Sequence, residues 1–111
     1  MKSLLQHVGL EMAKGYWIAQ VNVKNADGYK QYVGMLQDIF RKHQGRYVIR
    51  GGAMEIMEGQ SHPRLVVIEF PSYQAAVDCY RSPEYAKAIA VRQAAADANL
   101  IVADGYDGAQ P

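Results

Sequence analysis

The sequence contains a single cysteine, Cys79, among its 111 residues. One thiol cannot form an internal disulfide, which excludes the small secreted domains that disulfides hold together. The same scarcity fits a reducing compartment, so we expect a cytoplasmic protein.

An excess of charge of one sign is also absent, because 12 lysines and arginines against 11 aspartates and glutamates leave a formal net charge of +1. Nucleic acid is therefore not an expected partner, since phosphate binding needs a clear basic excess. No apolar run approaches the roughly 20 residues of a membrane-spanning helix, so no membrane partner is expected. The three histidines lack metal-ligand spacing, and neither a metal nor a cofactor is predicted.

What is present is the composition of an ordinary globular chain, half apolar and 21% charged, with room for one domain. We place this domain at residues 14–108. Residues 1–13 form an N-terminal extension that we expect to be loosely ordered. Met12 is a second candidate start, and residues 1–11 are predicted to be dispensable for folding.

The spacing of apolar residues predicts alternating strands and helices. The predicted elements are a strand over 15–23, a helix from the cap Asn25 to a left-handed Gly45, strands over 46–58 and 65–70 that form an antiparallel hairpin, a short helix capped by Ser72, a helix capped by Ser82 that runs to about Ala98, and a strand over 100–106. The order β-α-β-β-α-β predicts an α+β, ferredoxin-like fold, in which both helical segments cover one face of a four-stranded antiparallel sheet.

The uncovered sheet face should carry one alternate set of side chains from the first strand. The set is Tyr16, Ile18, Gln20 and Asn22, with Tyr47 and Tyr106 as further candidates. A half-apolar face of this size rarely stays exposed on a monomer. We therefore expect a homodimer in which a second copy covers this face and closes a barrel-like interior.

Glu69 ends an apolar strand, where a carboxylate is costly unless it is paired. Arg50 directly precedes Gly51-Gly52 on the neighbouring predicted strand, so the two charges could meet. One interpretation makes Glu69 a catalytic base and Arg50 its electrostatic partner or an anchor for an anionic substrate. The other makes them a semi-buried structural ion pair.

The helix junction at 80–85 gathers polar side chains at a helix start. Free amides at a helix N-terminus suit an anion, and Arg81, Ser82 and Tyr85 could complete a ligand site there. The alternative is capping plus packing, with Glu84 favouring the helix dipole, and the two interpretations are compatible because a helix start can be both. Cys79 has no histidine nearby in sequence and is predicted to be a packed side chain rather than a nucleophile.

Five segments together resemble the family called domain of unknown function 1330 (DUF1330). They are Lys14-Gly-Tyr-Trp-Ile18, Tyr29-Lys-Gln-Tyr32, Gly45-Arg-Tyr-Val-Ile-Arg-Gly-Gly52, Val67-Ile-Glu-Phe-Pro-Ser72 and Tyr80-Arg-Ser-Pro-Glu-Tyr85. The resemblance implies the dimeric α/β barrel superfamily, which includes cofactor-independent monooxygenases, muconolactone-type isomerases and haem-dependent proteins. No histidine suggests itself as a haem ligand.

Two functional hypotheses follow. The first is a cytoplasmic homodimer with a pocket between sheet and helices for a small acidic or aromatic molecule. Arg50 and Glu69 would anchor the ligand, with Arg81, Ser82, Tyr85 and Tyr16 around it. Its enzymatic version is a cofactor-independent isomerase or monooxygenase-like reaction. The second is a non-catalytic binding or regulatory module in which the Arg50–Glu69 pair is structural.

Overall fold

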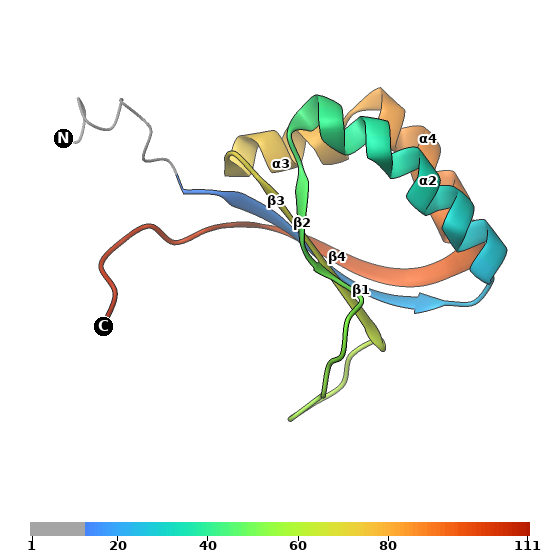
Figure 1. Cartoon of the computed structure of the whole chain (residues 1–111), viewed down its shortest axis with the longest axis horizontal. Helices are drawn as coiled ribbons and strands as arrows, with labels where there is room; N and C mark the ends of the chain where they lie inside the picture. The colour runs from blue at the N-terminus through green and yellow to red at the C-terminus, as the bar shows by residue number, and fades with distance from the viewer. Residues whose placement is uncertain (1–12) are drawn as a thin grey trace.

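The computed structural model describes residues 13–111, which form one antiparallel sheet with three helices on one face (Figure 1). The elements are β1 (Gly15–Val23), α2 (Ala26–His43), β2 (Arg46–Arg50), β3 (Arg64–Phe70), α3 (Tyr73–Tyr80), α4 (Pro83–Ala95) and β4 (Ala96–Asp104). The strand order is β2-β3-β1-β4, and every neighbouring pair is antiparallel. The predicted α+β, ferredoxin-like fold is confirmed. The predicted behaviour of residues 1–11 concerns a segment outside the described residues.

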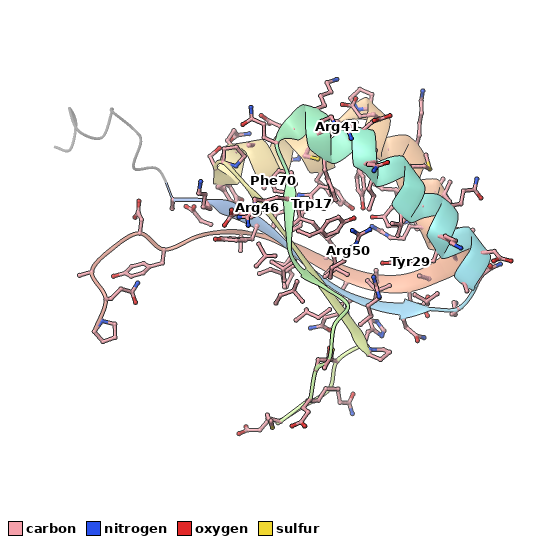
Figure 2. All side chains as sticks on the ribbon, viewed as in Figure 1. Trp17, Tyr29, Arg41, Arg46, Arg50 and Phe70 are labelled. Atoms are coloured by element: carbon pink, nitrogen blue, oxygen red, sulfur yellow. The ribbon has the colours of Figure 1, made fainter. Side chains whose placement is uncertain are left out.

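Trp17, at the middle of the sheet on β1, holds the two layers together. Its side chain is 1% exposed, and its indole N–H donates a hydrogen bond of 2.8 Å to the carbonyl oxygen of Ala76 in α3. Four rings surround it at centroid distances of 4.8–5.7 Å: Phe40, Phe70, Tyr80 and Tyr85. Figure 2 shows Trp17 between the sheet and the helices. Aromatic pairs in such edge-on and tilted arrangements add to the stability that area burial provides.

Helix α2 begins where the Asn25 side chain accepts a hydrogen bond from the Gly28 amide, as predicted. The predicted left-handed cap at Gly45 is wrong, because the residue in the left-handed region is Gln44, at φ 62°. Gly45 is needed for a different reason. A Cβ atom there would lie 2.8 Å from the ring of Phe70, so the chain can pass this ring only without a side chain.

The second predicted strand is much shorter than expected. β2 ends at Arg50 because Gly51 turns into the left-handed region at φ 69°, and residues 51–63 form no helix or strand. Within β2, the pairing with β3 shifts between Tyr47 and Ile49, so Val48 is an extra residue. Such a bulge moves the following side chains to the other sheet face.

The predicted boundary between the last helix and the last strand is also wrong. Helix α4 ends at Ala95, and β4 starts at Ala96 rather than at residue 100. β4 pairs with the whole of β1, from Ala96 opposite Val23 to Asp104 opposite Gly15. Alanine favours helices, but strand pairing over this length outweighs that local preference.

The sheet face away from the helices carries the predicted set from β1, because Trp17, Ala19 and Val21 point to the helices and the residues between them do not. Ile18 on this open face lies between Val67 of β3 and Ile101 of β4. Ile101 is 60% exposed in the single chain. Figure 1 shows no helix of residues 13–111 over this face.

Two glycines give a matched test of the fold. A Cβ at Gly15 would collide with the backbone carbonyl of Ser72, whereas a Cβ at Gly34 in α2 has open space around it. We expect Gly15→Ala to lower the free energy of unfolding by about 1–3 kcal/mol through overpacking. We expect Gly34→Ala to raise it by about 0.5–1 kcal/mol, because it reduces the entropy of the unfolded chain. Urea unfolding of both variants measures this, and equal effects would contradict the packing at β1.

Candidate ligand site

Glu69 and Arg50 do not meet, so their predicted pairing is wrong. Glu69 lies opposite Arg46 in the sheet, whereas Arg50 lies opposite Val66. The Glu69 carboxylate accepts a hydrogen bond of 3.0 Å from Arg46 and another of 3.0 Å from the Tyr16 hydroxyl. The bulge at Val48 separates the charges, since it leaves Arg46 with Glu69 on the open face and turns Arg50 to the helix side.

Tyr16 therefore belongs to the open face and not to the space under the helices. Burial and the hydrogen bond to Glu69 raise the pKa of the Tyr16 phenol, so it stays protonated and donates at neutral pH. Tyr47 is placed differently from the prediction, because it lies opposite Ile68 and faces the helices.

The junction at 80–85 is shaped by capping, the interpretation that is compatible with a ligand site there. Ser82 is buried, accepts a hydrogen bond from the amide of Tyr85 and donates one of 2.7 Å to the carbonyl of Cys79. Arg81 is exposed. Cys79 is completely buried, and burial raises the pKa of its thiol to about 12, as expected for a packed side chain.

A cavity of about 30 Å³ lies between the sheet and the helices, and this volume holds one or two water molecules. Its lining is mostly apolar and aromatic but includes three arginines, one each from β2, β3 and α4: Arg50, Arg64 and Arg92. Two surface clefts of about 400 and 420 Å³ adjoin it along α2. The first shares Tyr29 and Arg64 with the cavity and the second shares Tyr47 and Arg50, so these side chains separate the cavity from the clefts.

Each of the three arginines lies near a tyrosine ring. The guanidinium carbon of Arg50 is 4.1 Å from the ring centroid of Tyr47, and that of Arg64 is 5.6 Å from Tyr29. Figure 2 shows Arg50 between the sheet and α2, on the side of Tyr29. Arg92 is 8% exposed and donates a hydrogen bond of 2.8 Å to the Tyr85 hydroxyl.

Within residues 13–111, none of these three arginines forms an ion pair with an aspartate or glutamate. The Nε atom of Arg64 is buried without a hydrogen-bond partner in this part of the chain. An unpaired buried polar group is costly and is uncommon in folded proteins. The cavity therefore has positive charge and hydrogen-bond donors that the described residues do not neutralise.

Residues 14–106 match the family described as a domain of unknown function, DUF1330. The chain belongs to this family. The match covers all seven helices and strands, and it confirms the resemblance found in the sequence. No curated protein matches the chain.

Solved structures share the fold of this DUF1330 chain. A protein of unknown function from Rhodopseudomonas palustris is 22% identical, with a TM-score of 0.69 over 86% of this chain and 85% of that one. SnoaB, a cofactor-independent oxygenase from Streptomyces nogalater, is 12% identical, with a TM-score of 0.59 over 89% and 96%. A hypothetical protein of Arabidopsis thaliana is 11% identical, with a TM-score of 0.61 over 95% and 99%. At these identities the similarity establishes the fold alone.

Over residues 13–111, no group of three or more His, Cys, Asp or Glu side chains is placed to hold a metal ion. Among the helices of this region, none is long and apolar enough to cross a membrane.

Arg64 and Arg92 were not predicted as site residues, although the sequence pattern around each of them indicates a charged side chain at a core-facing position. Arg92 follows Tyr85 and Ala88 on the buried stripe of α4, where a charged side chain is unexpected. Arg64 precedes the apolar run of β3 and shares the alternate positions of Val66 and Ile68. A charge on a core-facing position is the pattern that identifies both.

Glu84 at the start of α4 generates a pH prediction. Hydrogen bonds with His43 and then Lys42, each 2.9 Å, lower the pKa of Glu84 from its ordinary 4.5 to about 2. A lowered pKa stabilises the fold above pH 4.5, and this stabilisation is lost as the pH falls towards 2. We expect Glu84→Gln to lower the melting temperature at pH 7 and to have no effect near pH 2. Thermal unfolding at several pH values tests this, with Glu58→Gln on the exposed loop as control. An equal effect at both pH values would contradict it.

Proposed function

We propose that this DUF1330 chain binds a small organic acid whose apolar or aromatic body occupies the clefts along α2 and whose polar groups reach the cavity between the sheet and the helices. The observation that carries the proposal is the convergence of Arg50, Arg64 and Arg92 on one apolar cavity without an acidic partner in residues 13–111. A ligand carboxylate would neutralise this charge, and guanidinium groups bind carboxylates through two parallel hydrogen bonds.

The lining supports an organic acid rather than an inorganic anion. Apart from the arginines, the cavity walls are made by aliphatic and aromatic side chains, including the rings of Tyr29 and Tyr47. Pockets of this composition bury the apolar body of a ligand and use a few polar groups to orient it. The adjoining clefts of about 400 and 420 Å³ are large enough for a molecule of one ring.

The proposal revises the roles predicted for the site residues. Arg50 remains a ligand-binding residue, and Tyr85 supports the site through Arg92. Glu69 and Tyr16 lie on the other face of the sheet, so they would not reach a ligand in this cavity. SnoaB is an oxygenase that needs no cofactor. If the bound acid is a substrate, we propose that it undergoes an oxygenase or isomerase reaction. Among the described residues, the cavity lining includes no Asp, Glu or His and the clefts add only the exposed Asp27, so we propose binding without assigning a base.

The arginines give a direct test with benzoate as probe. We expect the double variant Arg50→Met, Arg64→Met to bind benzoate at least about 10-fold more weakly, since a hydrogen bond to a charged group contributes about 1.5–3 kcal/mol. Arg81→Met is the matched control, because Arg81 is exposed and lies outside the cavity. Isothermal titration calorimetry measures the affinities.

Stability separates this result from misfolding. The double variant removes two cations that repel each other, so we expect its melting temperature without ligand to be unchanged or higher. Failure of benzoate to bind the wild-type protein, or equal losses in the Arg81→Met control, would contradict the proposal.

We also propose that the protein is a homodimer in which a second copy covers the open sheet face. Support comes from exposed apolar side chains on this face, including Ile49 and Ile101, and from the absence of any helix over it within residues 13–111. The hydrogen-bonded cluster of Tyr16, Arg46 and Glu69 would then lie at the edge of the interface. A cytoplasmic location stays a prediction from the single cysteine.

A charge on the open face, in the middle of the edge strand β4, tests the dimer. We expect Ile101→Glu to give a monomer, because two copies would bury this carboxylate without a partner. Ala90→Glu places the same charge on the exposed side of α4 and should leave the dimer intact. Light scattering with size-exclusion chromatography measures the mass. A wild-type monomer at micromolar concentration, or a dimeric Ile101→Glu variant, would contradict this interface.

A further inference from the structure

A chain of three polar side chains crosses the buried end of the cavity. Arg92 donates a hydrogen bond of 2.8 Å to the Tyr85 hydroxyl, and the hydroxyl oxygens of Tyr85 and Tyr32 are 2.7 Å apart. Tyr85 is completely buried and is not part of the cavity wall, whereas Tyr32 and Arg92 both line it. The chain therefore connects the core to the cavity at Tyr32.

The available donors and acceptors determine which hydroxyl group donates in the hydrogen bond between Tyr85 and Tyr32. A guanidinium has donors only, so the Tyr85 oxygen accepts from Arg92. The proton of Tyr85 then needs an acceptor, and the Tyr32 oxygen is the one that the described residues provide. If Tyr32 donated instead, the Tyr85 proton would be left unpaired inside the core, which is unfavourable. Tyr85 thus donates to Tyr32, and the Tyr32 proton is free to point into the cavity.

The chain also holds the Tyr32 hydroxyl beside the cavity as a protonated donor. The charge of Arg92 polarises the Tyr85 hydroxyl, which in turn polarises that of Tyr32, because successive hydrogen bonds strengthen one another. Burial raises the pKa of Tyr32 well above its ordinary value, so the group keeps its proton at neutral pH. The packing of the buried rings fixes the position of the Tyr32 hydroxyl oxygen.

Arg50 and Arg64 lie on the cleft side of the cavity, and Tyr32 lies on its buried side. Arg50 is exposed and Arg64 is half-buried, and both adjoin the surface clefts, whereas Tyr32 and Arg92 are buried. We infer that the ligands are aromatic acids with a second oxygen that accepts a hydrogen bond, such as hydroxy or oxo acids, and that Tyr32 is the donor that recognises this oxygen. This inference rests on the proposed function, because it requires a carboxylate at Arg50 and Arg64.

Matched pairs of acids test the inference. The probes are 4-hydroxybenzoate against 4-methylbenzoate and 3-hydroxybenzoate against 3-methylbenzoate, because hydroxyl and methyl groups are nearly equal in size. For the wild-type protein we expect the hydroxy acid of at least one pair to bind about 10-fold more tightly, as one well-placed hydrogen bond to a buried donor allows. Isothermal titration calorimetry measures each affinity, and the ratio within a pair is the readout.

Two variants then assign the preference to this chain. Tyr32→Phe should reduce the ratio to about 1, and a general loss of affinity cancels in the ratio. Tyr85→Phe keeps the Tyr32 hydroxyl but removes its hydrogen-bond partner, so the ratio should fall to an intermediate value. An unchanged ratio in Tyr32→Phe would overturn the inference.

The wild-type protein alone also gives a decisive result. If the acids bind but neither pair shows a preference for the hydroxyl, the inference fails while the proposed function stands. If none of the four acids binds, the proposed function fails and the inference fails with it.

Discussion

The pairing of β3 with both β1 and β2 is the constraint on which the two faces of the sheet depend. It places Val66 and Ile68 under the helices and Glu69 on the open face. The extra residue Val48 then gives Arg46 and Arg50 opposite faces, although they stand only four positions apart in one strand. Arg46 neutralises Glu69, and Arg50 contributes an unneutralised charge to the cavity.

The core and the cavity use aromatic side chains in different ways. Around Trp17, rings pack against each other and fill the space between the layers. Towards the edge of the sheet, Tyr29 and Tyr47 instead lie beside arginines, where a ring can stabilise a cation. Gathering Arg50, Arg64 and the buried Arg92 without acidic partners among residues 13–111 lowers the stability of a fold. Such a cost is expected where a binding site needs it.

Much of the fold followed from local patterns. The caps Asn25, Ser72 and Ser82 start helices where predicted, and the alternation in β1 correctly separates its two faces. The errors occur where a distant segment outweighs a local preference. Residues 96–99 are taken into the sheet by pairing with β1, and Gly45 is required by the ring of Phe70 rather than by its own backbone angle.

The sequence by itself determined the family, the order of the elements and the two-layer arrangement, because hydrophobic periodicity and capping are properties of neighbouring residues. Only the tertiary structure decided which charges meet. A single bulge reverses the face on which Arg50 lies, and no local pattern at Val48 reveals it. The cavity likewise combines Arg50, Arg64 and Arg92 from three separate elements, whose approach depends on strand register and helix packing rather than on spacing along the chain.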